Sequence, residues 1–226
     1  MKSFFVAVVL SLGMSLLACQ DTKDGLENKL ADRSYYKTIG KQIPFETGMR
    51  WMEFYQKRNS QEGRVSILSG YEISASQVET MLASVSDPVG VAFHYGTDSW
   101  GIRHIIAIPV DGSMSLWSSI PGRVFVDANT GNAISQSTAQ TWAQHYKNTH
   151  PTGIWFHFFG QNIFDEIVAI PFFNNLDIEP AIDDLTLLPQ LLLIVWNETS
   201  LLGGRTSEEE GLIFDASSPC PPCAVE

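Results

Sequence analysis

Two stretches of the chain carry apolar residues three and four positions apart, which is the spacing of a helix face that packs against a core. They are WMEFYQKRN at residues 51–59 and WAQHYKNTH at residues 142–150. Setting Ile43 against Ile134 aligns the two stretches at one offset. The predicted core positions of the pair are Trp51 and Tyr55 in the first helix and Trp142 and Tyr146 in the second.

The correspondence continues beyond these helices. A strand follows each one, RVSIL in the first copy and IWFHFF in the second, and Gly70 aligns with Gly160. A second helix then follows, over residues 74–85 in one copy and 162–170 in the other. In the first of these, Ser74 and Gln77 are placed for a capping box. Ser135 can cap the long helix of the second copy, and Pro44 can take the first turn of the long helix of the first copy.

Each copy ends in β structure. The segments GVAFHYG and IRHIIAIPV flank the turn TDSWG and predict a hairpin. The second copy offers LDIEPAI and LLLIVWN, where Pro180 and Pro189 interrupt the strands. A short strand closes each copy, at 123–131 and 212–220, and ends near Asp-Ala.

The predicted fold class is therefore α+β, with two tandem repeats of about 90 residues and antiparallel sheets packed against helices. Each repeat has the order helix, strand, helix, β-hairpin, strand, and we expect each long helix to pack on the strands of its own repeat. The expected boundaries are a signal peptide at 1–18, a flexible tether at 19–40, a first repeat at 41–131 and a second repeat with a Cys-containing tail at 132–226.

The first 18 residues form a secretory signal. Lys2 precedes an apolar run from Phe4 to Leu17, which is shorter than the roughly 20 residues of a spanning helix. The end of this run, Leu-Leu-Ala before Cys19, resembles the lipobox of bacterial lipoproteins. That resemblance implies cleavage before Cys19 and diacylation of its thiol. The alternative is an ordinary secretory signal with an incidental Cys.

A lipid anchor makes the membrane the first expected partner, because each buried methylene contributes about 0.8 kcal/mol and two or three chains hold a protein durably. The polar segment after Cys19 then acts as the tether. Its QDTKD start is similar to tracts that send lipoproteins of Bacteroidota to the cell surface. We expect an outer-membrane lipoprotein, with the cell surface preferred over the periplasmic face.

The repeat as a whole resembles small uncharacterised lipoproteins of Bacteroidota. The resemblance rests on the Trp-and-Tyr helix, the FFG at 158–160, the helix after it, the strand ending in Tyr95-Gly96 and the CPP tail at 220–222. It covers nearly all of the chain after the signal and implies no activity.

The charge balance and the absence of known motifs exclude several classes of function. The chain has 14 basic and 25 acidic residues and a net charge of −11, without a basic cluster, so no nucleic-acid partner is expected. The sequence contains no G-x-S-x-G, H-E-x-x-H, P-loop or G-x-G-x-x-G motif, and we assign no catalytic residue and no cofactor.

The cysteines and histidines supply the remaining candidates. Cys220 and Cys223 form a disulfide, a redox pair or half of a metal site, and an oxidising envelope favours the disulfide. His94 and His104 lie on facing strands of the first hairpin, directly opposite each other if the loop spans 96–102, and are weak metal candidates. Asp127 and Asp215 end corresponding strands, where turn chemistry explains them.

These observations predict an envelope protein with a binding or structural role, whose ligand is an envelope protein, a peptide or a glycan. The alternative is an envelope hydrolase with a site between the repeats. Of the six Trp residues, Trp100 in the hairpin turn is the one expected to be exposed.

Overall fold

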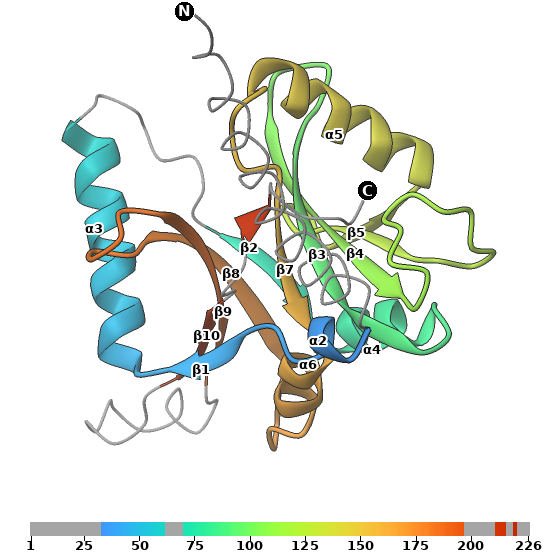
Figure 1. Cartoon of the computed structure of the whole chain (residues 1–226), viewed down its shortest axis with the longest axis horizontal. Helices are drawn as coiled ribbons and strands as arrows, with labels where there is room; N and C mark the ends of the chain where they lie inside the picture. The colour runs from blue at the N-terminus through green and yellow to red at the C-terminus, as the bar shows by residue number, and fades with distance from the viewer. Residues whose placement is uncertain (1–32, 62–69, 197–210, 216–218, 221–226) are drawn as a thin grey trace, which may run out of the picture.

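The structure, a computed structural model, describes residues 33–61, 70–196, 211–215 and 219–220. It is an α+β fold with two antiparallel sheets (Figure 1). The five-stranded sheet has the order β1-β10-β9-β8-β2, and the six-stranded sheet has the order β11-β7-β3-β4-β5-β6. The predicted fold class is confirmed at this level.

The described part of the chain holds the following helices and strands. The helices are α2 (Arg33–Tyr36), α3 (Phe45–Gln61), α4 (Ala75–Ala83), α5 (Gln136–Thr149) and α6 (Gln161–Val168). The strands are β1 (Lys41–Ile43), β2 (Tyr71–Ser74), β3 (Pro88–Thr97), β4 (Arg103–Asp111), β5 (Phe125–Asp127), β6 (Asn132–Ile134), β7 (Phe156–Gly160), β8 (Asn175–Ile182), β9 (Pro189–Val195), β10 (Leu212–Asp215) and β11 (Pro219–Cys220).

The main core lies between the two sheets. Side chains that alternate along each strand meet there, among them Phe93 and Ile105 from one sheet and Leu193 and Phe214 from the other. The outer face of the five-stranded sheet is covered by α3, and that of the six-stranded sheet by α5 (Figure 1). Helices α4 and α6 contribute Val78 and other apolar side chains to the main core. The result is a stack of helix, sheet, sheet and helix.

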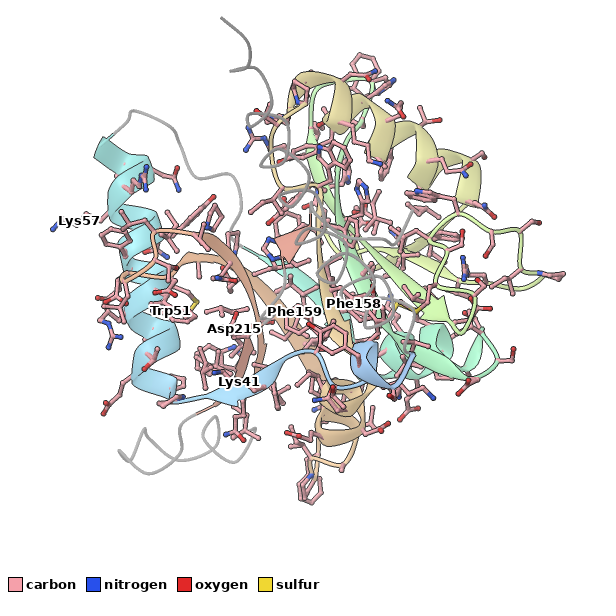
Figure 2. The ribbon with its side chains drawn as sticks, viewed as in Figure 1. Lys41, Trp51, Lys57, Phe158, Phe159 and Asp215 are labelled. Atoms are coloured by element: carbon pink, nitrogen blue, oxygen red, sulfur yellow. The ribbon has the colours of Figure 1, made fainter. Side chains whose placement is uncertain are left out.

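The long helix α3 packs closely because of Gly48. An ideal Cβ at this position would lie 2.6 Å from Cδ1 of Ile213 on β10, so a larger side chain would push the helix off the sheet. Trp51 and Met52 then bury against the same strand layer. Figure 2 shows Trp51 on the side of α3 that faces β10.

The two predicted side-chain caps are confirmed, whereas Pro44 directly precedes α3 and does not lie in its first turn. The Ser74 side chain accepts from the Gln77 N–H, and the Gln77 side chain accepts from the Ser74 N–H, which completes the capping box of α4. Ser135 caps α5 by accepting from the Thr138 N–H at 3.1 Å. The expected match of Gly70 with Gly160 is wrong. Gly160 follows β7 and is the N-cap of α6, the position that Ser74 holds before α4. Gly70 instead lies before β2, so the two glycines are not equivalent.

The expected packing of each long helix on the strands of its own half is also wrong. Helix α3 packs on β8 and β10, and α5 packs on β3. The ranges 41–131 and 132–226 do not form separate sheets, because β1 and β2 lie in one sheet with β8 to β10. Likewise, β6 and β7 lie in one sheet with β3 to β5. The strand expected at 64–68 lies outside the described residues.

Two prolines are tolerated in the second hairpin for geometric reasons. Pro189 is the first residue of β9, where a missing N–H is least costly. Pro180 lies beyond the part of β8 that pairs with β2, so β9 is its only partner strand among the described residues. Strand β8 therefore continues through Pro180, and β9 begins at Pro189, so neither proline interrupts a strand as the sequence predicted. In the described part of the chain, no helix is both long and apolar enough to cross a membrane.

Candidate functional site

A cavity of about 190 Å³ lies where the two hairpins, α3 and α5 come together. Both sheets contribute to it, so it forms only when the two halves of the chain pack. Its lining residues are Tyr55 from α3; Tyr95, Gly96, Arg103 and His104 from the first hairpin; Tyr146 from α5; Ile154; and Pro180, Ala181, Pro189 and Gln190 from the second hairpin.

Tyrosines form much of its apolar wall. The rings of Tyr95 and Tyr146 lie 5.3 Å apart at 30°, and Tyr55 approaches from the opposite helix. Burial raises the pKa of both Tyr95 and Tyr146, so the phenols stay neutral and keep their hydroxyl groups as donors. Two of these tyrosines, Tyr55 and Tyr146, are the residues that the sequence predicted as equivalent core positions.

The polar side of the cavity is built on His104. Its Nδ1 lies 3.0 Å from Oδ1 of Asp127, and the indole of Trp142 stacks on the imidazole with centroids 4.0 Å apart. Asp127 also accepts from the Asn129 N–H and the Thr130 hydroxyl. His104 is 6% exposed, and its Nε2 has no hydrogen-bond partner in the part of the chain that the structure describes.

The nearest charge to that nitrogen belongs to Asp98. Its Oδ2 lies 3.6 Å from His104 Nε2, beyond hydrogen-bond range. Burial alone would raise the pKa of Asp98, but the N–H groups of Ile102 and Trp100 and the contact with His104 outweigh it and lower the pKa. Asp98 therefore stays a carboxylate at neutral pH and fixes the hairpin turn. The turn leaves Trp100 87% exposed, as predicted.

Gln190 lies on the other side of the cavity. It is 8% exposed, and none of the described residues forms a hydrogen bond with its Oε1. Leaving a buried amide oxygen unpaired costs about 1 to 3 kcal/mol, so the fold gains nothing from this group as it stands. Arg103, which is exposed, adds a cationic donor to the cavity lining.

Near Gln190, the sheet carries a second buried carboxylate. Asp215 lies opposite Leu192 on β9 and Lys41 on β1 (Figure 2). Burial raises its pKa to about 6, although Lys41 acts in the opposite direction. Asp215 thus ends its strand as Asp127 does, but without a histidine partner among the described residues.

A larger hollow of about 460 Å³ runs along α5 and is lined by Trp117, Gln140 and Gln144, among others. Its amide and hydroxyl groups are exposed, and Gln144 bonds to Asn148 within the helix. In contrast to the smaller cavity, no polar atom of its lining residues is both buried and unpaired in the described structure. We therefore take the smaller cavity as the candidate site.

His94 and His104, which the sequence suggested as a pair, do not lie directly opposite each other in the structure. Gly96 is the residue opposite His104, and Ile106 is opposite His94, so the direct pairing expected across the hairpin is wrong. His94 is buried against Phe156 instead. No group of three or more His, Cys, Asp or Glu suited to a metal occurs among the residues that the structure describes.

The two predicted core tryptophans differ in burial, and one of the two tail cysteines lies in a described strand. Trp51 is buried and donates to Asp184 at 2.8 Å, whereas Trp142 is only partly buried. The backbone of Cys220 pairs with Phe156 through β11. Cys19 and Cys223 lie outside the described residues, so lipidation and the disulfide stay predictions.

Sequence reasoning missed Arg103 and Gln190, and it assigned Asp127 to a turn alone. A lone Gln or Arg on a strand carries no motif. The signal that was available is the i, i+2 alternation that puts His104 and Ile106 on one face, together with the closing strand that ends in Asp127.

The chain matches no protein-family model, no curated protein and no solved structure.

Proposed function

We propose that this chain is a lipid-anchored protein of the bacterial cell envelope that binds a ligand in the cavity between its two hairpins. The lipobox at Cys19 supports the anchor. The observation that carries the binding role is the composition of one cavity lining. It combines tyrosine rings with Gln190 and His104, two side chains that each hold a buried polar atom without a hydrogen-bond partner among the described residues. The cell surface is the preferred location, as the QDTKD tract suggests.

We further propose that the two halves are repeats that have exchanged their edge strands. The strand orders support this, because β1-β10-β9-β8-β2 and β6-β5-β4-β3-β7 correspond element by element. In one sheet, β1 and β2 of the first half flank the hairpin β8–β9 and the closing strand β10 of the second half. In the other sheet, β6 and β7 of the second half flank the hairpin β3–β4 and the closing strand β5 of the first half. An interlocked pair of this kind resembles a domain-swapped dimer joined into one chain.

The strand registers support the same proposal. Asp127 lies opposite Ile106 and Asn132, and Asp215 lies opposite Leu192 and Lys41. Ile106 and Leu192 are thus equivalent, and the residues two positions before them, His104 and Gln190, are equivalent as well. Their cross-strand partners are Gly96 and Ala181. The cavity then lies between equivalent positions, with Tyr55 facing the site from one helix and Tyr146 from the other.

A hydrolase is the second candidate, and the His104–Asp127 pair is what favours it. A carboxylate that holds a histidine by Nδ1 leaves Nε2 available as a general base. However, the lining residues of the cavity include no Ser, Thr or Cys that could act as a nucleophile. Such an enzyme would have to activate water, and the binding role requires fewer groups.

Two assays separate these roles. We expect purified full-length protein to hydrolyse neither p-nitrophenyl acetate nor p-nitrophenyl glycosides above the rate of a His104→Ala variant. Hydrolysis that is lost in His104→Ala but retained in His145→Ala would favour the enzyme. His145 is the matched control because it lies on the exposed face of α5, away from the cavity lining.

A further inference from the structure

The cavity lining restricts the chemistry of its ligand. Two of its lining residues carry a buried polar atom that has no hydrogen-bond partner among the described residues. These atoms are Oε1 of Gln190 and Nε2 of His104, and the Asp98 carboxylate lies 3.6 Å from the latter. Both side chains are more than nine-tenths buried. Because such atoms cost stability when they stay unpaired, a ligand that bonds to them recovers that free energy on binding.

The two atoms differ in what they require. The amide oxygen of Gln190 only accepts hydrogen bonds. The Nε2 of His104 accepts in the neutral ring and donates in the imidazolium. A hydroxyl group satisfies both atoms in either state of the histidine, because it donates and accepts.

Charged ligands fit the lining less well. A carboxylate has no hydrogen to give to Gln190, and both a carboxylate and a phosphate would approach a chain of net charge −11. An ammonium group would meet the guanidinium of Arg103 in the same cavity. A neutral ligand avoids both penalties, and Arg103 then donates to its oxygens.

The remaining walls are aromatic and apolar. Tyr55, Tyr95 and Tyr146 offer rings and hydroxyls, and the volume of about 190 Å³ is below the roughly 300 to 1,000 Å³ of drug-sized pockets. The cavity thus has room for one small cyclic unit. A sugar ring combines apolar faces with hydroxyl groups at its edge.

We propose that the cavity is a subsite for a single neutral sugar unit of a glycan, held by Gln190, His104 and Arg103 against the tyrosine walls. This inference rests on the proposed binding function and names its ligand class. Neutral sugars bound at one subsite have weak affinity, so the experiment must detect millimolar binding.

Saturation-transfer NMR on the full-length chain in detergent tests this proposal. The sugar probes are methyl glycosides of glucose, galactose, mannose and N-acetylglucosamine. Tetramethylammonium, acetate and phosphate form the charged set, with phosphate followed by phosphorus-31 line broadening. We expect at least one glycoside to bind and its affinity to be insensitive to salt, since screening affects charged ligands.

Paired variants locate the binding. Gln190→Leu removes the buried acceptor and should weaken the glycoside about 3- to 10-fold, the effect of one neutral hydrogen bond. Gln140→Leu makes the same change in the larger hollow on α5 and should leave the affinity unchanged. Because Leu at position 190 leaves no polar atom unpaired, this variant should fold at least as well as the wild type.

Three outcomes would overturn the inference. Binding of a charged probe but of no glycoside would refute the sugar class and keep the cavity as a binding site. If Gln140→Leu weakens glycoside binding and Gln190→Leu does not, the sugar binds in the larger hollow on α5. Failure of every probe would count against both the sugar and the proposed binding function.

Discussion

Nδ1 of His104 lies 3.0 Å from Oδ1 of Asp127, although 23 residues separate the two in the chain. The pair joins β4 to the end of β5 under the ring of Trp142, and it fixes the polar side of the cavity. This single contact has consequences for stability and for ligand binding.

Removing the carboxylate should destabilise the protein strongly. Asp127→Ala leaves His104 and the Asn129 N–H without their acceptor, and we expect a loss of about 2 to 4 kcal/mol in the free energy of unfolding. Asp127→Asn keeps an acceptor oxygen and should cost about half as much. Urea unfolding measures both.

The exposed Asp165 provides the control, since its one side-chain hydrogen bond among the described residues is accepted from Gln161 within α6. Asp165→Ala should change stability by less than about 0.5 kcal/mol. If Asp127→Ala behaves like Asp165→Ala, the His104–Asp127 contact has no structural role.

The buried Asp215 predicts a pH effect of definite sign. Because its folded pKa of about 6 lies above the ordinary value of 3.8, the folded chain holds the proton more tightly than the unfolded chain does. The contribution of Asp215 to stability is therefore complete below the unfolded pKa, and it falls as pH rises through the folded pKa. The loss is about 2 to 3 kcal/mol between pH 4 and pH 7.

Asp215→Asn removes this titration. The difference in unfolding free energy between the variant and the wild type should move in favour of the variant by that amount from pH 4 to pH 7. Comparing the two proteins cancels the other titrating groups, including Glu179, whose pKa burial raises to about 7. A difference that is constant over this range would contradict the buried position of Asp215.

Much of the secondary structure was predictable from the sequence because its signals are local. The Ser74–Gln77 capping box and the period of α3 depend on residues within a few positions of one another. The strand exchange was not predictable, because a hairpin at 90–110 has the same pattern whichever half supplies its neighbouring strands. The cavity depends on that exchange, so Gln190 and Arg103 could not be assigned to a common site.

The two tryptophans should differ in their contribution. Trp51 is buried against β10 and donates to Asp184, so Trp51→Ala should cost about 3 to 5 kcal/mol. Trp142 is partly exposed and covers His104, so Trp142→Ala should cost less, about 2 kcal/mol. Equal losses in urea unfolding would show that the two positions are buried alike.

The lipid anchor is tested at Cys19. Cys19→Ser removes the thiol that acylation requires, and the protein should move from the membrane fraction to the soluble fraction of its native cells. Cys223→Ser is the matched control and should stay with the membrane. An unmodified Cys19 in mass spectrometry of the wild-type protein would refute the lipoprotein proposal.

The six tyrosines of the chain allow a direct test of where the ligand binds. Protein labelled with 3-fluorotyrosine gives fluorine resonances that single Tyr→Phe variants assign. On titration with a methyl glycoside that binds, we predict shifts for Tyr55, Tyr95 and Tyr146, which line the cavity. Tyr35 and Tyr36 on α2 should keep their positions. Shifts confined to Tyr35 and Tyr36, or a bound probe that moves none of the three cavity tyrosines, would contradict this prediction.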